Sequence, residues 1–254
     1  MFRPRVIPCL LLHNGGLVKT KNFADPRYLG DPINAVKIFN DAEADELIFL
    51  DIDASKNGQT IDPEIVKGIS DEAFMPFAVG GGIKEVDDIR KMIDAGAEKV
   101  IINSAFYSKP SLVEQGAAIF GSQAITVSID AQWNEVTLNY ELYSKGASVK
   151  HDVSLEDQVM RAQEFGAGEI MINAIHKDGT RMGYDAELID RVSKISSVPI
   201  IACGGANSID DFAEGHKAGA SALAAGSMFV FVGRKSAVMI NYLELEDLNE
   251  VFNG

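Results

Sequence analysis

Two glycine-rich turns, Val79–Gly82 and Cys203–Ala206, are the parts of this sequence best suited to bind a charged ligand. Further along the chain, each is followed by a serine-bearing turn, Asn103–Ser104 and Gly226–Ser227. Glycine lets backbone N–H groups approach an anion closely, and a serine at the start of a helix adds a hydroxyl donor. One copy would indicate no more than a tight turn, but two paired copies favour two phosphate-binding sites.

The paired turns belong to an internal repeat with a constant offset of 123 residues. Ala44–Leu50 recurs as Ala167–Asn173, and Pro76 recurs as Pro199. Because the offset is about half the length of the chain, the repeating unit is half of one fold rather than a short solenoid module.

Short β-branched segments alternate with amphipathic segments in both halves. Strands are expected at residues 4–12, 46–52, 76–80, 98–103, 123–130, 168–174, 198–203 and 221–226. Eight near-continuous apolar strands that alternate with helices predict an α/β fold, a (β/α)8 barrel with a two-fold half-barrel repeat. An open doubly wound sheet is the alternative, but it does not explain the repeat. We expect a single domain over 1–254, with half-barrels at about 1–122 and 123–254.

Local signals add four predictions outside the strands. Ser208, followed by two aspartates, should start a helix with a hydroxyl cap and an acidic first turn. Residues 13–31 are interpreted as a long mobile loop after the first strand, and 139–153 as an extended loop after the fifth. A short helix is expected at Leu245–Val251.

In a barrel of this kind, ligands bind on the loops that follow the strands. We therefore expect two cups at one mouth, which suits a ligand with phosphate at both ends. Asp178-Gly179-Thr180, after the sixth strand, would add backbone donors to the second cup. The first cup comprises Gly82, Asn103 and Ser104, and the second comprises Gly179, Gly205, Gly226 and Ser227.

Composition excludes several classes of partner. The chain has 254 residues, and 37 acidic against 23 basic side chains give a formal charge of −14. Such a chain has no general attraction for nucleic acid or for an anionic membrane surface. No apolar run reaches membrane-spanning length, and the two cysteines fit a reducing cytoplasm. The four histidines show no ligand spacing, so we expect no metal site. We expect no cofactor either.

These segments together identify a family. The chain resembles, from end to end, the cyclase subunit of imidazole glycerol phosphate synthase. The matching pieces are Val18-Lys19, Phe49–Asp51, Val79–Ile83, Asn103-Ser104, Phe120–Ala124, Ile129–Ala131, Gly166–Ile170, Asp178–Thr180 and Gly183–Asp185. The related isomerase of the same pathway shares the half-barrel repeat, but its signature pieces match less well and it uses no ammonia.

The resemblance implies a two-fold barrel that binds a long bisphosphate. A separate glutaminase subunit would dock under the barrel and release ammonia, which would travel through the core to the mouth. There it would attack the substrate, which closes to an imidazole ring and expels an aminoimidazole carboxamide nucleotide. The implied ligand-binding residues are those of the two cups with Asp178 and with Lys19, on the loop after the first strand.

The family's ammonia entrance is a ring of alternating charges at the strand starts. This chain supplies Arg5, Glu46, Lys99 and Glu169 for it. Strand alternation places Arg5 on the same face of the first strand as Leu11. If that face points into the barrel, the charged residues lie inside it at its base, and the functional positions lie inside it at its mouth. The alternative is four separate solvated strand starts, but opposite charges inside a barrel would balance one another.

The expected catalytic residues depart from the family. Ring closure there relies on two aspartates, at the ends of strands one and five, which move protons. Asp130 occupies the second position, but Leu11 occupies the first and cannot transfer a proton. At the end of strand six, Asn173 and His176 stand where the family has a threonine and an acid. Since Leu11 removes a facing charge, we expect Asp130 to titrate as an ordinary carboxyl group.

Three functions follow from these residues. The first is a barrel that delivers ammonia from a glutaminase to a different acceptor, as in a branch of the family that serves a sugar amidotransferase in surface-polysaccharide biosynthesis. The second is an active cyclase of histidine biosynthesis in which His13 or His176 replaces the missing aspartate. The third is a non-enzymatic scaffold with inherited turns. Loss of one proton-transfer group costs about 10²–10⁴-fold in rate, which favours the first.

Overall fold

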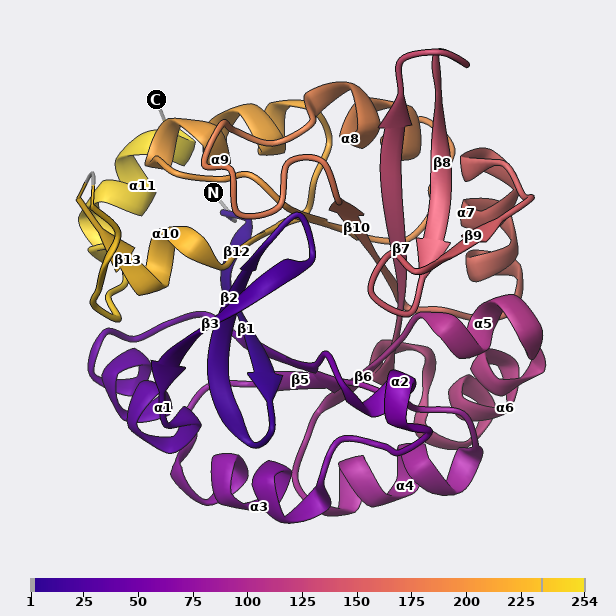
Figure 1. Ribbon diagram of the computed structural model, residues 1–254, viewed down its shortest axis with the longest axis horizontal. Helices are drawn as coiled ribbons and strands as arrows, with labels where there is room; N and C mark the ends of the chain where they lie inside the picture. Colours follow the sequence, from indigo (N-terminus) through magenta and orange to yellow (C-terminus); the bar gives the residue numbers. More distant parts are fainter. Residues whose placement is uncertain (1–2, 234, 254) are drawn as a thin grey trace.

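The computed structural model describes residues 3–233 and 235–253, and its central feature is a closed barrel of eight parallel strands (Figure 1). Adjacent strands pair in chain order, and pairing between the fifth and sixth completes the ring. The strands are β1 (Arg5–His13), β4 (Leu47–Asp51), β5 (Phe77–Gly80), β6 (Lys99–Ile102), β7 (Ile125–Asn134), β10 (Glu169–Ala174), β11 (Ile200–Cys203) and β12 (Ala222–Ala225). The predicted (β/α)8 barrel is confirmed, and each predicted strand overlaps one of these.

Helices form the outer layer. The longer ones are α1 (Pro32–Asp41), α3 (Pro63–Glu72), α4 (Val86–Asp94), α6 (Ser111–Phe120), α7 (Leu155–Glu164), α8 (Ala186–Ser193), α9 (Ile209–Lys217) and α11 (Leu245–Asn253). Short turns of helix follow several strands at the mouth: α2 (Ala54–Asn57), α5 (Ser104–Ser108) and α10 (Ser227–Val230). A 3-10 turn (Ser122–Ala124) precedes β7, and β13 (Phe231–Val232) pairs with β14 (Ala237–Val238).

The predicted helix signals are confirmed. Ser208 caps α9, because its hydroxyl accepts from the Asp211 N–H at 3.4 Å while the Asp211 carboxylate accepts from the Ser208 N–H at 2.8 Å. This reciprocal arrangement satisfies donors that the helix itself leaves unpaired. The C-terminal helix α11 extends two residues beyond its predicted end at Val251.

Strand alternation divides the buried side chains into two cores. One core lies between the strands and the helices, and its largest members are Phe39, Phe49, Phe106, Phe212 and Phe229. The other fills the barrel interior and consists of Ile7, Cys9, Ile48, Ala78, Ile101, Met171, Ile201, Cys203, Ala222 and Ala224. We call this interior the lumen. Both cysteines are buried and free, as expected of small apolar side chains.

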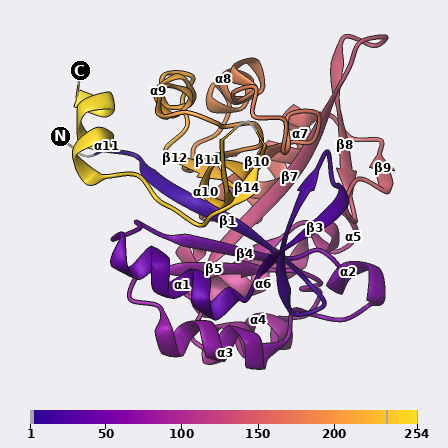
Figure 2. The ribbon, with the colours of Figure 1, turned by 60° about the vertical axis from the view of Figure 1, so that its left-hand side comes forward.

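Two hairpins rise from the mouth, where the sequence had indicated loops (Figure 2). The first hairpin, β2 (Gly16–Lys21) and β3 (Ala24–Gly30), continues antiparallel from β1. The second hairpin, β8 (Asn139–Ser144) and β9 (Val149–His151), pairs with the part of β7 beyond the barrel. The predictions of loops over 13–31 and over 139–153 are therefore both wrong. Tyr140, Leu142 and Ser144 are buried and alternate with less buried residues, which is the period of a strand.

None of the helices in the described part of the chain combines the length and the apolar character needed to cross a membrane.

Candidate functional site

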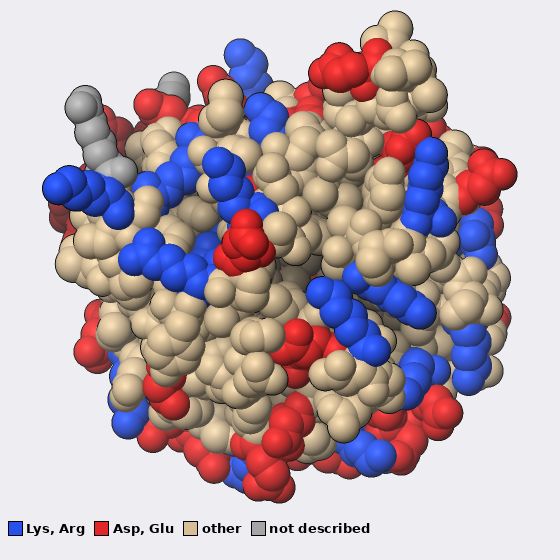
Figure 3. Space-filling view, viewed as in Figure 1, with Lys and Arg blue, Asp and Glu red and all other residues tan. Residues whose placement is uncertain are grey.

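One pocket occupies the mouth of the barrel, at the C-terminal ends of the strands. All ten residues predicted to bind or act on a ligand line it: Lys19, Gly82, Asn103, Ser104, Asp130, Asp178, Gly179, Gly205, Gly226 and Ser227. Figure 3 shows Lys and Arg side chains around the hollow on this face, although the whole chain is strongly acidic. The structure thus brings the two predicted cups together, and their roles stay predictions.

The first cup lies where β5 and β6 end. The Gly82 N–H donates to the Ser55 hydroxyl at 3.2 Å, and the Ser104 hydroxyl donates to the Asn103 side-chain oxygen at 3.3 Å. The second hairpin reaches this cup, because the Lys145 N–H donates to the Ser104 hydroxyl at 3.3 Å. Lys56 and Lys145 line the same pocket and give this cup a cationic side that the sequence analysis missed.

Gly82 has a φ of 68°, and a Cβ there would lie 1.7 Å from the Gln59 carbonyl oxygen. Gly58 provides a matched comparison, since its φ is 69° and a Cβ there would meet nothing within 4 Å. We expect Gly58→Ala to cost only backbone strain, about 1 kcal/mol, and Gly82→Ala to cost more and to abolish phosphate binding at the first cup. Thermal unfolding and phosphate titration of both variants measure this. If the two variants lost stability and phosphate binding equally, close packing at Gly82 would not be important.

The second cup lies where β10, β11 and β12 end, and the first hairpin covers it. The Lys19 ammonium pairs with the Asp178 carboxylate at 2.8 Å and donates to the Thr20 carbonyl oxygen at 3.0 Å. The Lys19 side chain runs so close to Gly226 that a Cβ on Gly226 would lie 3.0 Å from Lys19 Cε. Because Lys19 and Asp178 are both buried, each charge depends on the other. This pair therefore holds the first hairpin onto the second half of the barrel.

Arg181 is a further residue of the second cup that the sequence analysis missed. It lines the pocket, and its buried Nη2 has no hydrogen-bond partner among the described residues. Its guanidinium lies over the Phe231 ring at 5.4 Å, and that of Arg27 lies over the same ring at 5.1 Å. Its position directly after Asp178-Gly179-Thr180 was the signal that could have identified it.

Asp130 lies at the top of the lumen, on β7, and is 8% exposed. The Asn103 amide donates to its carboxylate at 3.2 Å. Burial, followed by the nearby Asp178 carboxylate, raises the pKa of Asp130 from 3.8 to about 7, although hydrogen bonds from Asn173 and Asn103 lower it. The expectation of an ordinary carboxyl group is therefore wrong, because burial and Asp178 outweigh the absence of a charge at Leu11. Leu11 itself lines the pocket beside Leu50, its register partner on β4.

The two histidines considered as substitutes for the missing aspartate have other partners. His13 Nδ1 lies 2.6 Å from the Asp53 carboxylate. His176 Nδ1 accepts from the Trp133 N–H at 3.3 Å, while its Nε2 lies 3.0 Å from the Asp185 carboxylate. Neither histidine is among the described residues that line the pocket. These contacts favour positioning roles over proton transfer to a ligand in the mouth.

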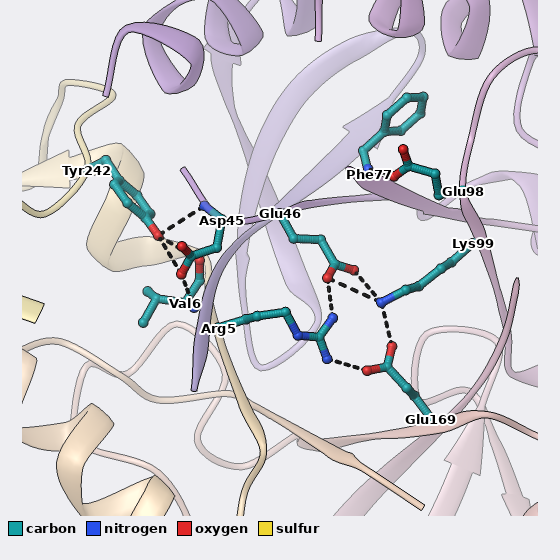
Figure 4. A network of polar contacts seen from close by, with 9 residues as sticks. All are labelled: Arg5, Val6, Asp45, Glu46, Phe77, Glu98, Lys99, Glu169 and Tyr242. Carbon is teal, nitrogen blue, oxygen red and sulfur yellow. Dashed lines mark hydrogen bonds and ion pairs between the residues drawn. The ribbon is translucent and has the colours of Figure 1, made fainter. Parts of the chain in front are cut away.

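The four residues predicted for the entrance meet at the opposite end of the lumen. Arg5 contacts the carboxylates of Glu46 and Glu169, and Figure 4 shows the side chains pointing toward one another. Lys99 Nζ lies 3.1 Å from Glu46 and 2.7 Å from Glu169. Burial lowers the pKa of Arg5, but the two carboxylates outweigh it and raise that pKa overall. We call these four residues the charge ring, which rules out four separate solvated strand starts.

Comparison with known proteins identifies the relatives of this chain. A family model described as "Histidine biosynthesis protein" matches residues 5–234. Imidazole glycerol phosphate synthase subunit HisF of Alkaliphilus metalliredigens is 41% identical over 230 residues, which cover 90% of this chain and 91% of the relative. The subunit of the same name in Natranaerobius thermophilus is 41% identical over 244 residues, 96% of each chain.

A third relative carries a numbered name. The Pseudomonas aeruginosa protein provisionally named imidazole glycerol phosphate synthase subunit hisF2 is 43% identical over 253 residues, which cover 98% of this chain and 99% of the relative. The fold, the family model and these near full-length matches agree. This chain belongs to the histidine biosynthesis protein family, among the HisF-type subunits of imidazole glycerol phosphate synthase.

Proposed function

We propose that this protein is the barrel subunit of a glutamine amidotransferase complex. A glutaminase subunit would dock at the base of the barrel, and its ammonia would pass the charge ring and the lumen to a phosphorylated ligand at the mouth. One observation carries the proposal: the charge ring and the two-cup pocket lie at opposite ends of the same lumen. A scaffold with inherited turns would have no use for buried charges there, because they are costly unless they serve a purpose.

Leu11 determines the proposed acceptor. With leucine in place of an aspartate, the mouth keeps the two cups but has one proton-transfer group fewer, so ring closure should be slow. We therefore propose a paralogue that passes ammonia on to a sugar amidotransferase for amidination of a surface-polysaccharide sugar. The numbered names of two relatives, hisF2 and hisF3, agree with such a second branch.

Asp130 favours a second candidate, an active cyclase of histidine biosynthesis. A carboxyl group with a pKa of about 7 can both accept and donate a proton near neutral pH, which is what a general acid or base requires. In that reaction the two cups would fix the phosphates of the bisphosphate. Asp130, held by the Asn103 amide, would then exchange protons with the closing ring.

The test is to mix the barrel with its cognate glutaminase and to measure glutamine hydrolysis with and without a bisphosphate ligand. We expect hydrolysis to rise when the ligand occupies the mouth. A barrel that neither binds nor activates a glutaminase from its own genome would overturn the proposed complex.

Reversing Lys99 to glutamate should uncouple glutamine hydrolysis from ammonia use, or weaken the complex. The change leaves Arg5 facing three carboxylates, and breaking a buried ion pair costs about 3–5 kcal/mol. The ratio of glutamate released to ammonia incorporated measures coupling, and titration of the glutaminase measures affinity. Lys91→Glu, at an exposed pair with Asp87 on α4, is the control and should change neither. Normal coupling and affinity in Lys99→Glu would exclude a role for the charge ring.

A further inference from the structure

Positive charge gathers on one side of the mouth, mostly outside the pocket. Figure 3 shows Lys and Arg side chains over the β13–β14 hairpin, on the left of this face. Four cations belong to this group: Arg27 on β3, Lys177 and Arg181 on the connection after β10, and Lys235 in the β13–β14 turn. Only Arg181 among them lines the pocket. Within the described part of the chain, no carboxylate forms an ion pair with any of the four, so their charge is available to a partner.

One aromatic ring brings these segments together. The Phe231 ring on β13 lies 5.1 Å from the Arg27 guanidinium carbon and 5.4 Å from that of Arg181. Arg27 also donates to the Ser236 carbonyl oxygen at 3.0 Å, directly beside Lys235. The first hairpin, the connection after β10 and the β13–β14 hairpin therefore form one continuous surface at the edge of the second cup.

Apolar side chains are exposed among these cations. Met182 follows Arg181 and is 74% exposed, and the Lys177 ammonium donates to its carbonyl oxygen at 3.5 Å. Val238, in register with Phe231, is also exposed. We call the following residues the rim patch: Arg27, Lys177, Arg181, Met182, Phe231, Lys235 and Val238. Arginine, methionine and aromatic side chains are the types enriched in protein interfaces, so the composition of the rim patch is that of a binding surface.

We propose that the rim patch docks the acceptor enzyme, a protein that presents an acidic and partly apolar face to the mouth. The inference rests on the proposed ammonia-delivering function. Ammonia that escapes from the mouth into neutral water becomes ammonium, which has no lone pair with which to attack an acceptor. The enzyme that consumes the ammonia must therefore seal the mouth, and the rim patch borders the mouth.

The charge of the molecule favours a protein as the occupant. The whole chain carries a formal charge of −14, which repels nucleic acid and anionic membranes at long range. An acidic patch on a protein would complement the four local cations at short range, which favours rapid and specific association. The exposed methionine and valine would supply the apolar part of the contact.

The interface should extend across the mouth, because a stable one takes about 20–30 residues from each partner. The β7–β8 turn offers a second exposed apolar surface, since Val136 is 91% and Leu138 is 68% exposed. In Figure 1 this turn extends beyond the ring of helices, on a different side of the barrel from β13. A partner that contacts both the rim patch and this turn would cover the pocket between them.

Direct binding tests the rim patch. The barrel is titrated with the sugar amidotransferase encoded in the same genome, and affinity is measured. Met182→Glu puts a charge of the wrong sign on an exposed apolar position, so affinity should fall at least about tenfold. Met160→Glu, at a 41% exposed methionine on α7, is the matched control and should bind like wild type. Equal losses in both variants, or no loss in Met182→Glu, would overturn the proposal.

Lys235→Glu tests whether the partner's face is acidic. A charge at the edge of an interface acts mainly on the association rate, so this variant should associate more slowly and with a weaker dependence on salt. Lys217→Glu, at an exposed lysine at the end of α9, is the control. A wild-type association rate and salt dependence in Lys235→Glu would exclude recognition by charge.

The functions of the barrel alone provide a second readout. Neither Met182 nor Lys235 lines the pocket, so both variants should keep wild-type binding of the glutaminase and wild-type glutamine hydrolysis with ligand. Ammonia incorporated by the amidotransferase should fall, and ammonia released to solvent should rise. Vesicles of equal parts phosphatidylglycerol and phosphatidylethanolamine should not bind the barrel. Vesicle binding that Met182→Glu abolishes would make the rim patch a membrane surface and overturn the protein partner.

Failure of this proposal is distinguishable from failure of the proposed function. A barrel that activates its glutaminase but does not bind the amidotransferase would keep the glutaminase complex and overturn the docking surface. A barrel that binds the amidotransferase through the rim patch but no glutaminase would support the docking surface and overturn ammonia delivery.

Discussion

Leu11→Asp is expected to raise ring closure with free ammonium salts at least about tenfold. Wild type should turn over a bisphosphate at least about 10²-fold more slowly than a barrel with two aspartates, because a general acid or base is worth about 10²–10⁴-fold. Recovery should be partial, since Asn173 and His176 also differ from the family pattern. Ammonium salts bypass any partner, so the measurement reports on the mouth alone.

Leu50→Asp is the matched control for this prediction. Leu50 also lines the pocket and is paired in register with Leu11 on the neighbouring strand. A carboxyl group at position 50 should not raise the rate of ring closure, because only the end of β1 corresponds to the family's catalytic position. Wild-type turnover close to that of a two-aspartate cyclase would instead make histidine-pathway cyclisation the function.

Asp130→Asn is expected to change how stability depends on pH. The pKa of Asp130 is about 7 in the fold and 3.8 as the ordinary value, so the folded state binds more protons between these limits. The stabilisation that comes from keeping the Asp130 carboxyl group protonated in the fold is therefore fully present below about pH 4 and is lost as the pH rises to 7. The difference corresponds to about 4 kcal/mol in the free energy of unfolding.

Urea unfolding of wild type and Asp130→Asn from pH 4 to 8 measures this contribution. Wild type should lose stability relative to the variant between pH 4 and 7, and the two curves should approach a parallel course towards pH 8. Asp41→Asn, at an exposed carboxylate, controls for the change of charge. If the stability of wild type and of Asp130→Asn changed with pH in parallel over the whole range, burial would not raise the pKa of Asp130.

The sequence predicted those features that depend on local pattern. Alternation along the strands predicted the inward face of β1, and the glycine-serine repeats predicted the residues that the structure brings together at the mouth. The second hairpin was missed although its signal was present, because the alternation of Tyr140, Leu142 and Ser144 was outweighed by the polar, small residues around them.

Other features depend on contacts between distant segments and could not be predicted. The pKa of Asp130 depends on how deeply β7 is buried and on Asp178 from another loop. The contact between His13 and Asp53 is equally non-local, since Asp53 lies on the connection after β4, and so is the contact between His176 and the Trp133 N–H on β7.

The two hairpins have a consequence for how the two halves depend on each other. The first hairpin belongs to the N-terminal half, yet Lys19 binds Asp178 in the C-terminal half. The second hairpin belongs to the C-terminal half, yet Lys145 contacts Ser104 in the N-terminal half. Each half therefore carries a cup that only the other half can cover. A half-length chain would contain one cup and one hairpin, but its hairpin could not reach its own cup. It would need a second copy, whose hairpin would cover the cup of the first. In one joined chain, each cup and the hairpin that covers it can change in sequence independently of the other pair.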